Sequence, residues 1–255
     1  MINDLDNILT LNKFDSSNTI DSIRNLSSQC RQAWDETQAL MLPKYYENIK
    51  NIVVSGMGGS SYGVRIIKSL YDGAEYTKVP LELANGYWLP GYVDGSSLVI
   101  LSSYSGATEE TLEVARQAHR KKTKIIGLTT GGKLAAFLSD NNYPSYIFNP
   151  IYNPCKQPRF GVGYMVIGLT GILAKLKKIP VGSAEIRQII SLLDKQTLLF
   201  DSKTFSGANP AKQLARKLFG KIPVLVVADF LEGAAYAVRN QLHETAKQFA
   251  LYFSI

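Results

Sequence analysis

One stretch, Asn51–Asp72, most constrains what this chain can fold into. Its sequence, NIVVSGMGGSSYGVRIIKSLYD, begins with a short apolar run, turns through glycine and serine, and continues with apolar residues at helical spacing. The pattern predicts a buried strand at 51–55, a turn at 56–61 and a helix over about 60–72. Glycine lets a backbone approach a ligand closely, and the free N–H groups of a helix N-terminus favour anions. The turn therefore predicts a site for a phosphate or a phosphorylated small molecule; the alternative is a structural turn without a ligand.

Two common glycine motifs do not fit this turn. The dinucleotide-binding fingerprint G-x-G-x-x-G would need a third glycine where this chain has Ser61. No acidic residue ends a following strand at the spacing that a ribose hydroxyl requires. A Walker A loop needs the sequence G-K-[ST], which the turn lacks. The sequence therefore predicts neither a dinucleotide site nor a nucleotide-binding P-loop.

Short apolar strands alternate with helices through the middle of the chain. We expect strands at 51–55, 79–84, 97–102, 124–129 and 146–148, and helices at about 60–72, 109–121 and 133–138. This order predicts an α/β fold, with an open, doubly wound parallel five-stranded sheet flanked by helices. Ligands of such sheets bind at the carboxyl ends of the strands. Residues 1–48 are predicted to be helical, with an amphipathic helix at 21–41, and the sheet domain is expected to span 49–205.

The last part of the chain predicts the beginning of a second α/β domain at 206–255. We expect a glycine-rich helix at 164–176, helices at 183–200 (capped by Ser183), 209–219 and 231–249, and strands at 223–228 and 251–254. The glycines suggest close packing of the first of these helices against another helix or a second subunit. One strand–helix–strand unit cannot bury both faces of its sheet. We therefore expect it either to extend the first sheet or to lack a C-terminal portion.

Composition excludes several classes of partner. The net charge of +7 fits an anionic ligand, but the basic residues are dispersed or lie at predicted helix ends, so we expect no nucleic acid. Two cysteines and two histidines lack metal-ligand spacing, so no metal site is expected and a reducing cytoplasmic location is favoured. No signal peptide and no uncharged apolar run of about 18 residues is present, so no membrane association is expected.

A second hydroxyl-rich turn follows the third predicted strand. Its sequence is SSYSGATEET, at 102–111. Ser103, Ser105 and Thr108 can all face one point, with helix N–H groups from Ala107 onward beside them. Hydroxyls at a helix N-terminus suit a phosphate dianion without a cation. Thr108 is also a suitable helix cap, and the two roles are compatible.

Together these turns resemble a known family. GMGGSS at 56–61 and SSYSGATEET at 102–111 are similar to the paired motifs of SIS (sugar isomerase) domains, and QPRFGVGY at 157–164 and RNQLHETAK at 239–247 resemble elements of the bifunctional phosphoglucose/phosphomannose isomerases. The resemblance covers about residues 20–255. It implies SIS-type folds and interconversion of glucose 6-phosphate or mannose 6-phosphate with fructose 6-phosphate through a cis-enediol. It also implies a cytoplasmic homodimer serving glycolysis and gluconeogenesis.

The resemblance also implies roles for individual residues. Arg159 would stabilise the enediolate, and Glu244 would move a proton between C1 and C2. The sugar phosphate would be held by Gly58, Gly59, Ser60, Ser103, Ser105 and Thr108. Aldose–ketose isomerisation needs one base of tuned pKa and a positive neighbour for the developing oxyanion, and no metal or nucleotide cofactor. Arginine keeps its charge throughout, so it does not compete for the proton. Without the resemblance, periodicity favours Glu244 as one exposed carboxylate among many on an amphipathic helix, and for Arg159 a surface charge at a helix start is the alternative.

Departures from the family pattern leave alternatives open. Ala107 replaces a usual asparagine, and His243 and Thr245 flank Glu244 where asparagine is usual. The family's downstream "PELNHN" histidine and a later lysine would lie beyond Ile255, and His243 is not that histidine, so we expect a truncated chain; the alternative is a natural short form. Such a chain could be an isomerase, a non-catalytic SIS module that binds or senses sugar phosphates, or an inactive fragment. Residues 1–48 lack the short turn and basic helix of a DNA-binding regulator.

Overall fold

The central element of the protein is a parallel five-stranded sheet. The computed structural model describes residues 5–71 and 79–255. The strands are β1 (Asn51–Ser55), β2 (Leu81–Ala84), β3 (Ser97–Ser103), β4 (Lys124–Thr129) and β5 (Ser145–Ile147), and they lie in the order β2-β1-β3-β4-β5. The predicted fold class is therefore confirmed. The order reverses between β1 and β3, which is where ligands of doubly wound sheets bind.

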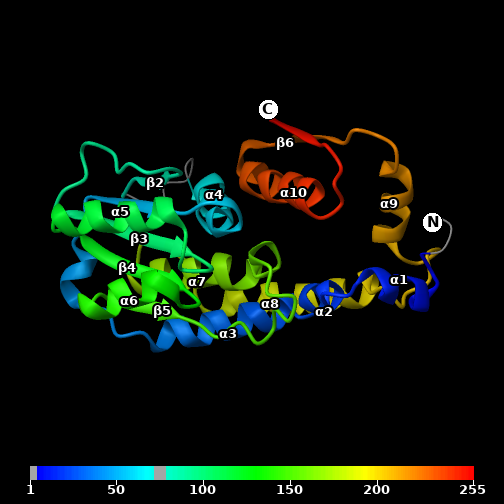
Figure 1. Ribbon diagram of the computed structural model, residues 1–255, viewed down its shortest axis with the longest axis horizontal. Helices are drawn as coiled ribbons and strands as arrows, with labels where there is room; N and C mark the ends of the chain where they lie inside the picture. Colours follow the sequence, from blue (N-terminus) through cyan, green and yellow to red (C-terminus); the bar gives the residue numbers. More distant parts are fainter. Residues whose placement is uncertain (1–4, 72–78) are drawn as a thin grey trace.

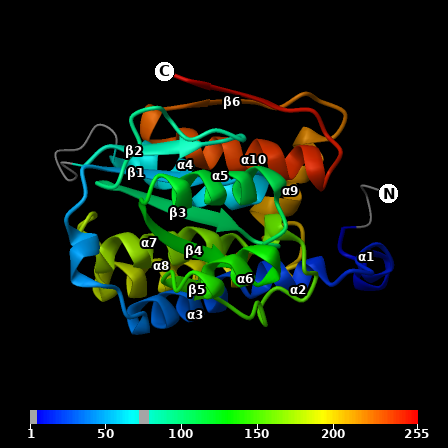
Figure 2. The ribbon, with the colours of Figure 1, turned by 60° about the vertical axis from the view of Figure 1, so that its left-hand side comes forward.

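Helices cover both faces of this sheet (Figures 1 and 2). Residues of the strands alternate between the two faces, so Val54 and Ile100 belong to one apolar core and Val53 and Val99 to the other. The helices concerned are α3 (Leu26–Ala39), α4 (Tyr62–Tyr71) and α7 (Val162–Lys175) on the first face, and α5 (Glu109–Arg120) and α6 (Gly132–Asp140) on the second. All residues of β3 are buried, as expected for a central parallel strand covered on both faces.

The glycines of α7 serve packing within the chain. A Cβ on Gly163 would lie 2.6 Å from the Gln29 Cβ of α3, and one on Gly171 would overlap the Thr37 side chain of the same helix. Glycine thus lets the backbones of α3 and α7 approach closely. Of the two expectations for this helix, packing against another helix is confirmed. Because these glycines already pack against α3, they do not support contact with a second subunit.

Several predicted helix boundaries are wrong. The helix predicted at 21–41 is two helices, α2 (Thr19–Arg24) and α3, which separate at Asn25 because its ψ of 11° departs from helical geometry. The predicted cap Ser183 lies inside α8 (Ser183–Phe200): the N-cap is Gly182, whose N–H donates to the Glu185 carboxylate at 2.9 Å. The helix predicted at 60–72 is α4, and its last predicted residue lies outside the described residues.

The C-terminal residues form a separate two-stranded parallel sheet. It consists of β6 (Val224–Val227) and β7 (Leu251–Ser254), which are joined by α10 (Glu232–Glu244) and preceded by α9 (Pro210–Leu218). The sheet does not extend the first one. Its apolar side chains remain open to solvent, with Val226 60% and Phe253 55% exposed. The division into 1–48, 49–205 and 206–255 stays a prediction.

Helix α10 is shorter than the predicted helix at 231–249. It ends at Glu244, and residues after it form a turn in which Lys247 has a φ of 52°. Within the turn, the Ala250 N–H donates a hydrogen bond of 3.0 Å to the His243 Nε2. The turn returns the chain so that β7 pairs parallel with β6. Periodicity alone missed it because the apolar spacing continues past Glu244.

Helix α10 packs closely on α4, as Figures 1 and 2 both show. The crossing point is Gly233, where an added Cβ would overlap the backbone carbonyl of Arg65 and approach Ile66 N to 2.5 Å. Because backbone atoms cannot move as a side-chain end can, only glycine fits this position. The crossing fixes where the C-terminal end of α10 lies relative to the five-stranded sheet.

Replacing Gly233 with alanine is expected to push α10 away from α4. Overpacking of this kind costs about 1–3 kcal/mol of folding free energy. The free energy of unfolding in urea and hydrogen exchange along α10 would both report the change. Gly86→Ala is the matched control, since a Cβ there meets nothing within 4 Å. Equal stability of the two variants would contradict the close crossing.

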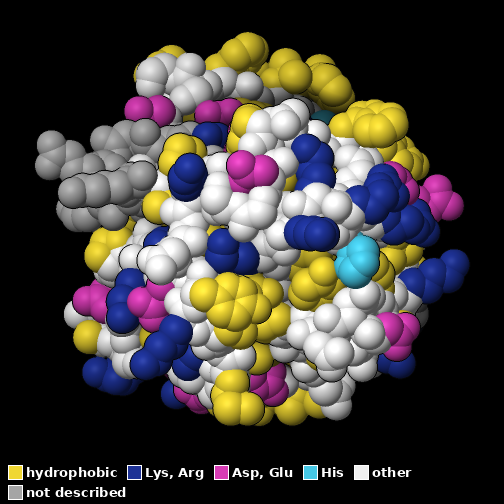
Figure 3. All heavy atoms as spheres, turned by 90° about the vertical axis from the view of Figure 1, so that its left-hand side faces the viewer, with side chains coloured by type: hydrophobic (Ala, Val, Ile, Leu, Met, Phe, Trp, Pro, Cys, Tyr) yellow, Lys and Arg dark blue, Asp and Glu magenta, His cyan; other side chains and the backbone are white. Residues whose placement is uncertain are grey.

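The surface shows no gathering of basic side chains on the face drawn in Figure 3. Lys and Arg are interspersed there with acidic, apolar and neutral groups. Among the helices of the described residues, none is both long enough and apolar enough to cross a membrane.

Candidate functional site

The glycine turn after β1 forms a single turn of 3-10 helix, η3 (Gly58–Ser61), that leads directly into α4. Gly58 has a φ of 50°, a conformation that favours glycine. A Cβ on Gly56 would lie 2.8 Å from the Ser60 carbonyl oxygen, so this position also requires glycine. The glycines therefore shape a tight turn at the carboxyl edge of the sheet, as the sequence predicts.

Ser60 ties the two predicted phosphate loops together. Its hydroxyl accepts a hydrogen bond of 2.9 Å from the Tyr104 N–H, and its carbonyl accepts one of 2.8 Å from the Ser102 hydroxyl. Ser60 is buried by these contacts. A hydroxyl that accepts from one group still has its own hydrogen to donate. Ser60 therefore has a structural role, and its phosphate-binding role stays a prediction.

The loop after β3 gathers the other predicted hydroxyls. The Ser103 and Thr108 hydroxyl oxygens lie 2.8 Å apart, and the Gly106 N–H donates to Ser103 at 3.1 Å. Thr108 is the N-cap residue of α5, but its side chain makes no capping hydrogen bond. Ser105 is exposed and accepts a bond of 3.3 Å from the Ala107 N–H. The structure thus brings Ser103 and Thr108 together and leaves Ser105 accessible beside them.

Arg159 and Glu244 meet although they are far apart in the sequence. Arg159 lies in η4 (Pro158–Phe160), and Glu244 is the last residue of α10. The Arg159 Nη1 lies 3.6 Å from the Glu244 Oε2, with side chains 25% and 44% exposed. The Arg159 Nε donates to the Thr245 hydroxyl at 3.3 Å, and the Gln241 side chain donates to the Arg159 carbonyl at 3.3 Å. Residues of α10 and the following turn therefore hold this arginine in place.

This charge pair adjoins both hydroxyl-rich loops. A Cβ on Gly59 would lie 3.3 Å from the Arg159 backbone nitrogen, so η3 and η4 are in contact. A Cβ on Gly161, just after η4, would overlap the Tyr104 ring of the second loop. The predicted site residues from four segments thus lie along one edge of the sheet. The arrangement offers donors for an anion beside a carboxylate and a fixed positive charge.

His243 contacts the turn that follows α10. Its Nε2 lies 3.0 Å from Ala250 N, and its ring stacks on Phe249 at 5.5 Å between centroids. The prediction that His243 does not take the role of the family's downstream histidine fits this geometry. In the parts of the chain that the structure describes, no group of three or more His, Cys, Asp or Glu side chains is placed to hold a metal ion.

Two residues that contact Arg159 were not predicted as site residues from the sequence. Gln241 and Thr245 both bond to Arg159. In the sequence, Gln241 is only a member of the 239–247 motif, and Thr245 is only a departure from the family pattern.

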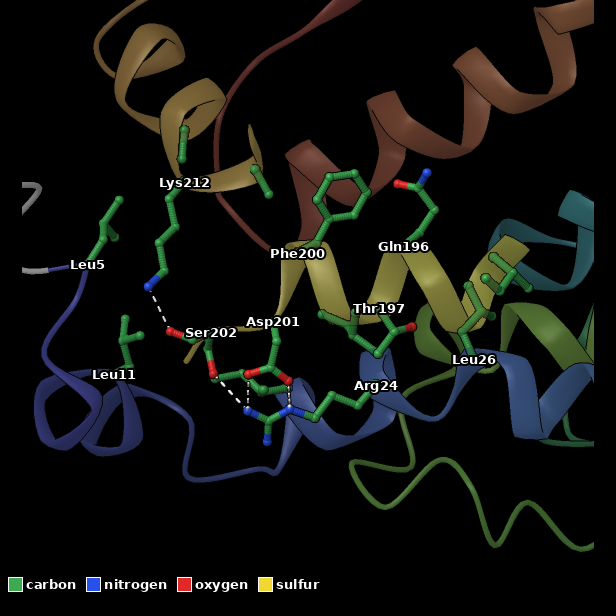
Figure 4. A pocket seen from close by; sticks show the side chains of 15 residues that line it. Leu5, Leu11, Arg24, Leu26, Gln196, Thr197, Phe200, Asp201, Ser202 and Lys212 are labelled. Atoms are coloured by element: carbon green, nitrogen blue, oxygen red, sulfur yellow. Dashed lines mark hydrogen bonds and ion pairs between the residues drawn. The ribbon is translucent and has the colours of Figure 1, made fainter. Parts of the chain in front are cut away.

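A cavity of about 540 Å³ lies elsewhere, between α2, α8, α9 and the N-terminal helix α1 (Ile8–Phe14) (Figure 4). Its charged groups are already paired. The Arg24 Nε donates to Asp201 at 2.6 Å, and the Lys212 ammonium donates to the Asp6 carboxylate at 3.0 Å and the Ser202 carbonyl at 2.7 Å. Most of the remaining lining is apolar. These features do not suit a sugar phosphate, which needs donors that are free.

The chain is similar in sequence to known phosphoglucose isomerases. Residues 207–255 match the model of the bacterial phospho-glucose isomerase C-terminal SIS domain. The chain is 32% identical over 237 residues to a bifunctional phosphoglucose/phosphomannose isomerase of Caldicellulosiruptor bescii, covering 92% of this chain and 68% of the relative. It is 28% identical to a protein of the same name from Thermoplasma acidophilum, covering 90% of this chain and 69% of that relative.

A solved structure of a Thermus thermophilus protein shares the fold. Its TM-score is 0.71 at 14% identity, and the match covers 98% of this chain and 63% of that one. The chain thus spans about two thirds of the length of the proteins it matches. The match to the first relative, at 32% identity, covers 92% of this chain and 68% of that protein. The chain therefore belongs to the family of the bifunctional phosphoglucose/phosphomannose isomerases.

Proposed function

We propose that the chain carries the site of an aldose–ketose isomerase that interconverts glucose 6-phosphate and mannose 6-phosphate with fructose 6-phosphate. The observation that carries the proposal is the Arg159–Glu244 pair, 3.6 Å apart, beside two loops rich in glycine and hydroxyl groups. The relatives at 28% and 32% identity bear the names of both activities. A base, a cation and a phosphate-binding edge are the groups that this reaction needs.

The two loops hold the phosphate and so place the other end of the sugar near the charge pair. The Glu244 carboxylate removes the proton from C2 of the open-chain aldose. The electron pair of that C–H bond forms the C1–C2 double bond, and the carbonyl oxygen becomes the enediolate oxygen, whose negative charge the Arg159 guanidinium stabilises. Return of the proton from Glu244 to C1, with transfer of the hydroxyl proton from O2 to O1, gives the ketose.

The phosphate loop is tested by calorimetry with fructose 6-phosphate. Ser105→Ala is expected to weaken binding by about 10- to 150-fold, because a hydrogen bond to a charged group contributes roughly 1.5–3 kcal/mol. Ser96→Ala is the control: Ser96 is a loop serine that bonds to Asp94 just before β3, at the opposite edge of the sheet. Equal affinity of both variants and the parent would argue against the loop as the phosphate site.

A second candidate is a non-catalytic SIS module that binds sugar phosphates. The observation that favours it is the open apolar face of the β6–β7 sheet, where Val226 and Phe253 are exposed. Turnover distinguishes the two candidates: conversion of fructose 6-phosphate to glucose 6-phosphate or mannose 6-phosphate, followed by proton NMR, requires an enzyme. Binding without conversion over days would favour the module.

We also propose that the protein acts as a cytoplasmic homodimer in glycolysis and gluconeogenesis. The family supports the homodimer. The α7 glycines, which also suggested a second subunit, pack against α3 of the same chain. In the amphipathic helix predicted at 21–41, Cys30 and Trp34 are buried in the core beneath the sheet, whereas Ile23 and Met41 are exposed. Sedimentation velocity at micromolar concentration would test the dimer.

A further inference from the structure

Arg65 connects the glycine turn after β1 with the C-terminal helix α10. It is a partly buried residue of α4, four residues after Ser61. Its Nε donates a hydrogen bond of 3.3 Å to the Ser61 hydroxyl, and that hydroxyl donates one of 2.8 Å to the Gly58 carbonyl. The guanidinium therefore supports the end of the turn through the Ser61 side chain.

The same guanidinium reaches the beginning of the turn through Asn85, which directly follows β2. The Asn85 amide is oriented so that its oxygen faces a donor and its nitrogen an acceptor. Its oxygen then accepts a hydrogen bond of 3.2 Å from the Arg65 Nη2, and its nitrogen donates one of 3.2 Å to the Gly56 carbonyl. Both ends of the turn at 56–61 are thus linked to one guanidinium.

The third partner of Arg65 is Tyr236 of α10. The guanidinium carbon lies 3.9 Å from the centre of the Tyr236 ring, well within the range of a cation–π interaction. Tyr236 follows Gly233 by three residues, so it lies on the face of α10 that crosses α4. A ring this close to the guanidinium carbon restricts where the guanidinium can lie.

Arginine suits these three contacts better than lysine does. Its planar guanidinium presents N–H donors in fixed directions and also stacks on aromatic rings, whereas the lysine ammonium is a compact point charge. Tyr236 moves with α10, and the guanidinium that it contacts is bonded to the groups at both ends of the turn. A displacement of α10 is therefore expected to disturb the turn.

We propose that Arg65 is a positioning residue that couples the placement of α10 to the shape of the glycine turn. Tyr236 holds the guanidinium, and the guanidinium holds Ser61 and Asn85. The consequence for ligand binding rests on the function proposed above, in which this turn binds the phosphate of the sugar. Because Glu244 is the last residue of α10, the packing of one helix prepares both the base and the phosphate-binding turn.

Hydrogen exchange of the Ser60 amide tests the coupling without a ligand. The Ser60 N–H donates to the Met57 carbonyl at 3.0 Å inside the turn, so its exchange rate reports opening of the turn. Arg65→Lys keeps the charge but loses the fork of donors, and Tyr236→Leu removes the ring. Each is expected to accelerate this exchange by about tenfold. The double variant should exchange little faster than either single variant, because both substitutions break the same link.

Two control variants and a second amide separate this coupling from a general loss of stability. Tyr236→Phe keeps the ring and should leave the Ser60 exchange rate within about twofold of the parent. Arg239→Lys is the matched control, because Arg239 also lies over the Tyr236 ring, at 4.7 Å, but donates to Asn240 and not to the turn. The Phe148 N–H donates to the Thr129 carbonyl at 3.1 Å. Its exchange reports opening at the other side of the sheet and should stay constant.

Calorimetry with fructose 6-phosphate tests the consequence for binding. Arg65→Lys is expected to bind about tenfold more weakly than the parent, because a loosened turn must be ordered when the ligand binds. Arg239→Lys and Tyr236→Phe should bind as the parent does.

Unchanged exchange of the Ser60 amide in Arg65→Lys, or a rise that the Phe148 amide shares, would overturn the proposal whether or not the protein binds sugar phosphates. Faster exchange at Ser60 with unchanged affinity would overturn the role of Arg65 in binding. Faster exchange in a protein whose parent form binds no fructose 6-phosphate would support the coupling while rejecting the function proposed above. The two proposals therefore fail separately.

Discussion

Replacing Glu244 with glutamine is expected to lower kcat for the interconversion of glucose 6-phosphate and fructose 6-phosphate by about 10²–10⁴-fold, the usual contribution of a general base. Glutamine keeps the size and the position of the side chain at the end of α10 but cannot accept the C2 proton. Affinity for fructose 6-phosphate should stay within about threefold, because the predicted phosphate loops are untouched. Deuterium exchange at C1 and C2 in heavy water, followed by NMR, measures the proton-transfer step directly.

Glu47→Gln is the matched control for this variant. The Glu47 side chain is 44% exposed, as Glu244 is, and it forms a comparable ion pair of 3.4 Å with Lys177. Both substitutions thus remove one carboxylate from a half-exposed pair, but Glu47 lies in η2 (Lys44–Glu47), before β1 and away from the site. Exchange that survives in Glu244→Gln at the level of the control would mean that another group is the base.

Replacing Gly106 with alanine is expected to lower the free energy of unfolding by about 3 kcal/mol and to disrupt the second hydroxyl-rich loop. Gly106 has a φ of 64°, which strains any residue with a Cβ. The added Cβ would also overlap the Gly131 carbonyl and lie 2.8 Å from the Thr129 hydroxyl. Conformational strain and overpacking each cost about 1–3 kcal/mol. Urea unfolding followed by circular dichroism measures the loss.

The loop change has a functional consequence as well. The Gly106 N–H donates to the Ser103 hydroxyl, which in turn meets Thr108, so a displaced Gly106 should separate the predicted phosphate ligands. Gly91→Ala serves as control, since an added Cβ there has open space. Fructose 6-phosphate should bind Gly91→Ala normally and Gly106→Ala at least tenfold more weakly. Unimpaired binding by a destabilised Gly106→Ala would place the phosphate elsewhere.

The sequence alone was sufficient for the five-stranded sheet and for the two loops. Central parallel strands are buried on both faces, so they are continuous apolar runs, as in β3, and runs of this kind are visible without a structure. Glycine and serine between a strand and a helix likewise show a close turn with hydroxyl donors. Helix ends were less certain, as Asn25 and the turn after Glu244 show, because an apolar period does not reveal where a backbone leaves helical geometry.

The meeting of Arg159 with Glu244 was decided by tertiary structure. Their proximity depends on α10 crossing α4 at Gly233 and on the contact of Gly59 with η4. The period of a helix defines which of its faces is apolar, but not which neighbour that face packs on, so Glu244 reads as an ordinary surface carboxylate. Local chemistry thus determined the strands and the two hydroxyl-rich loops, whereas Arg159 and Glu244 came together only through long-range packing.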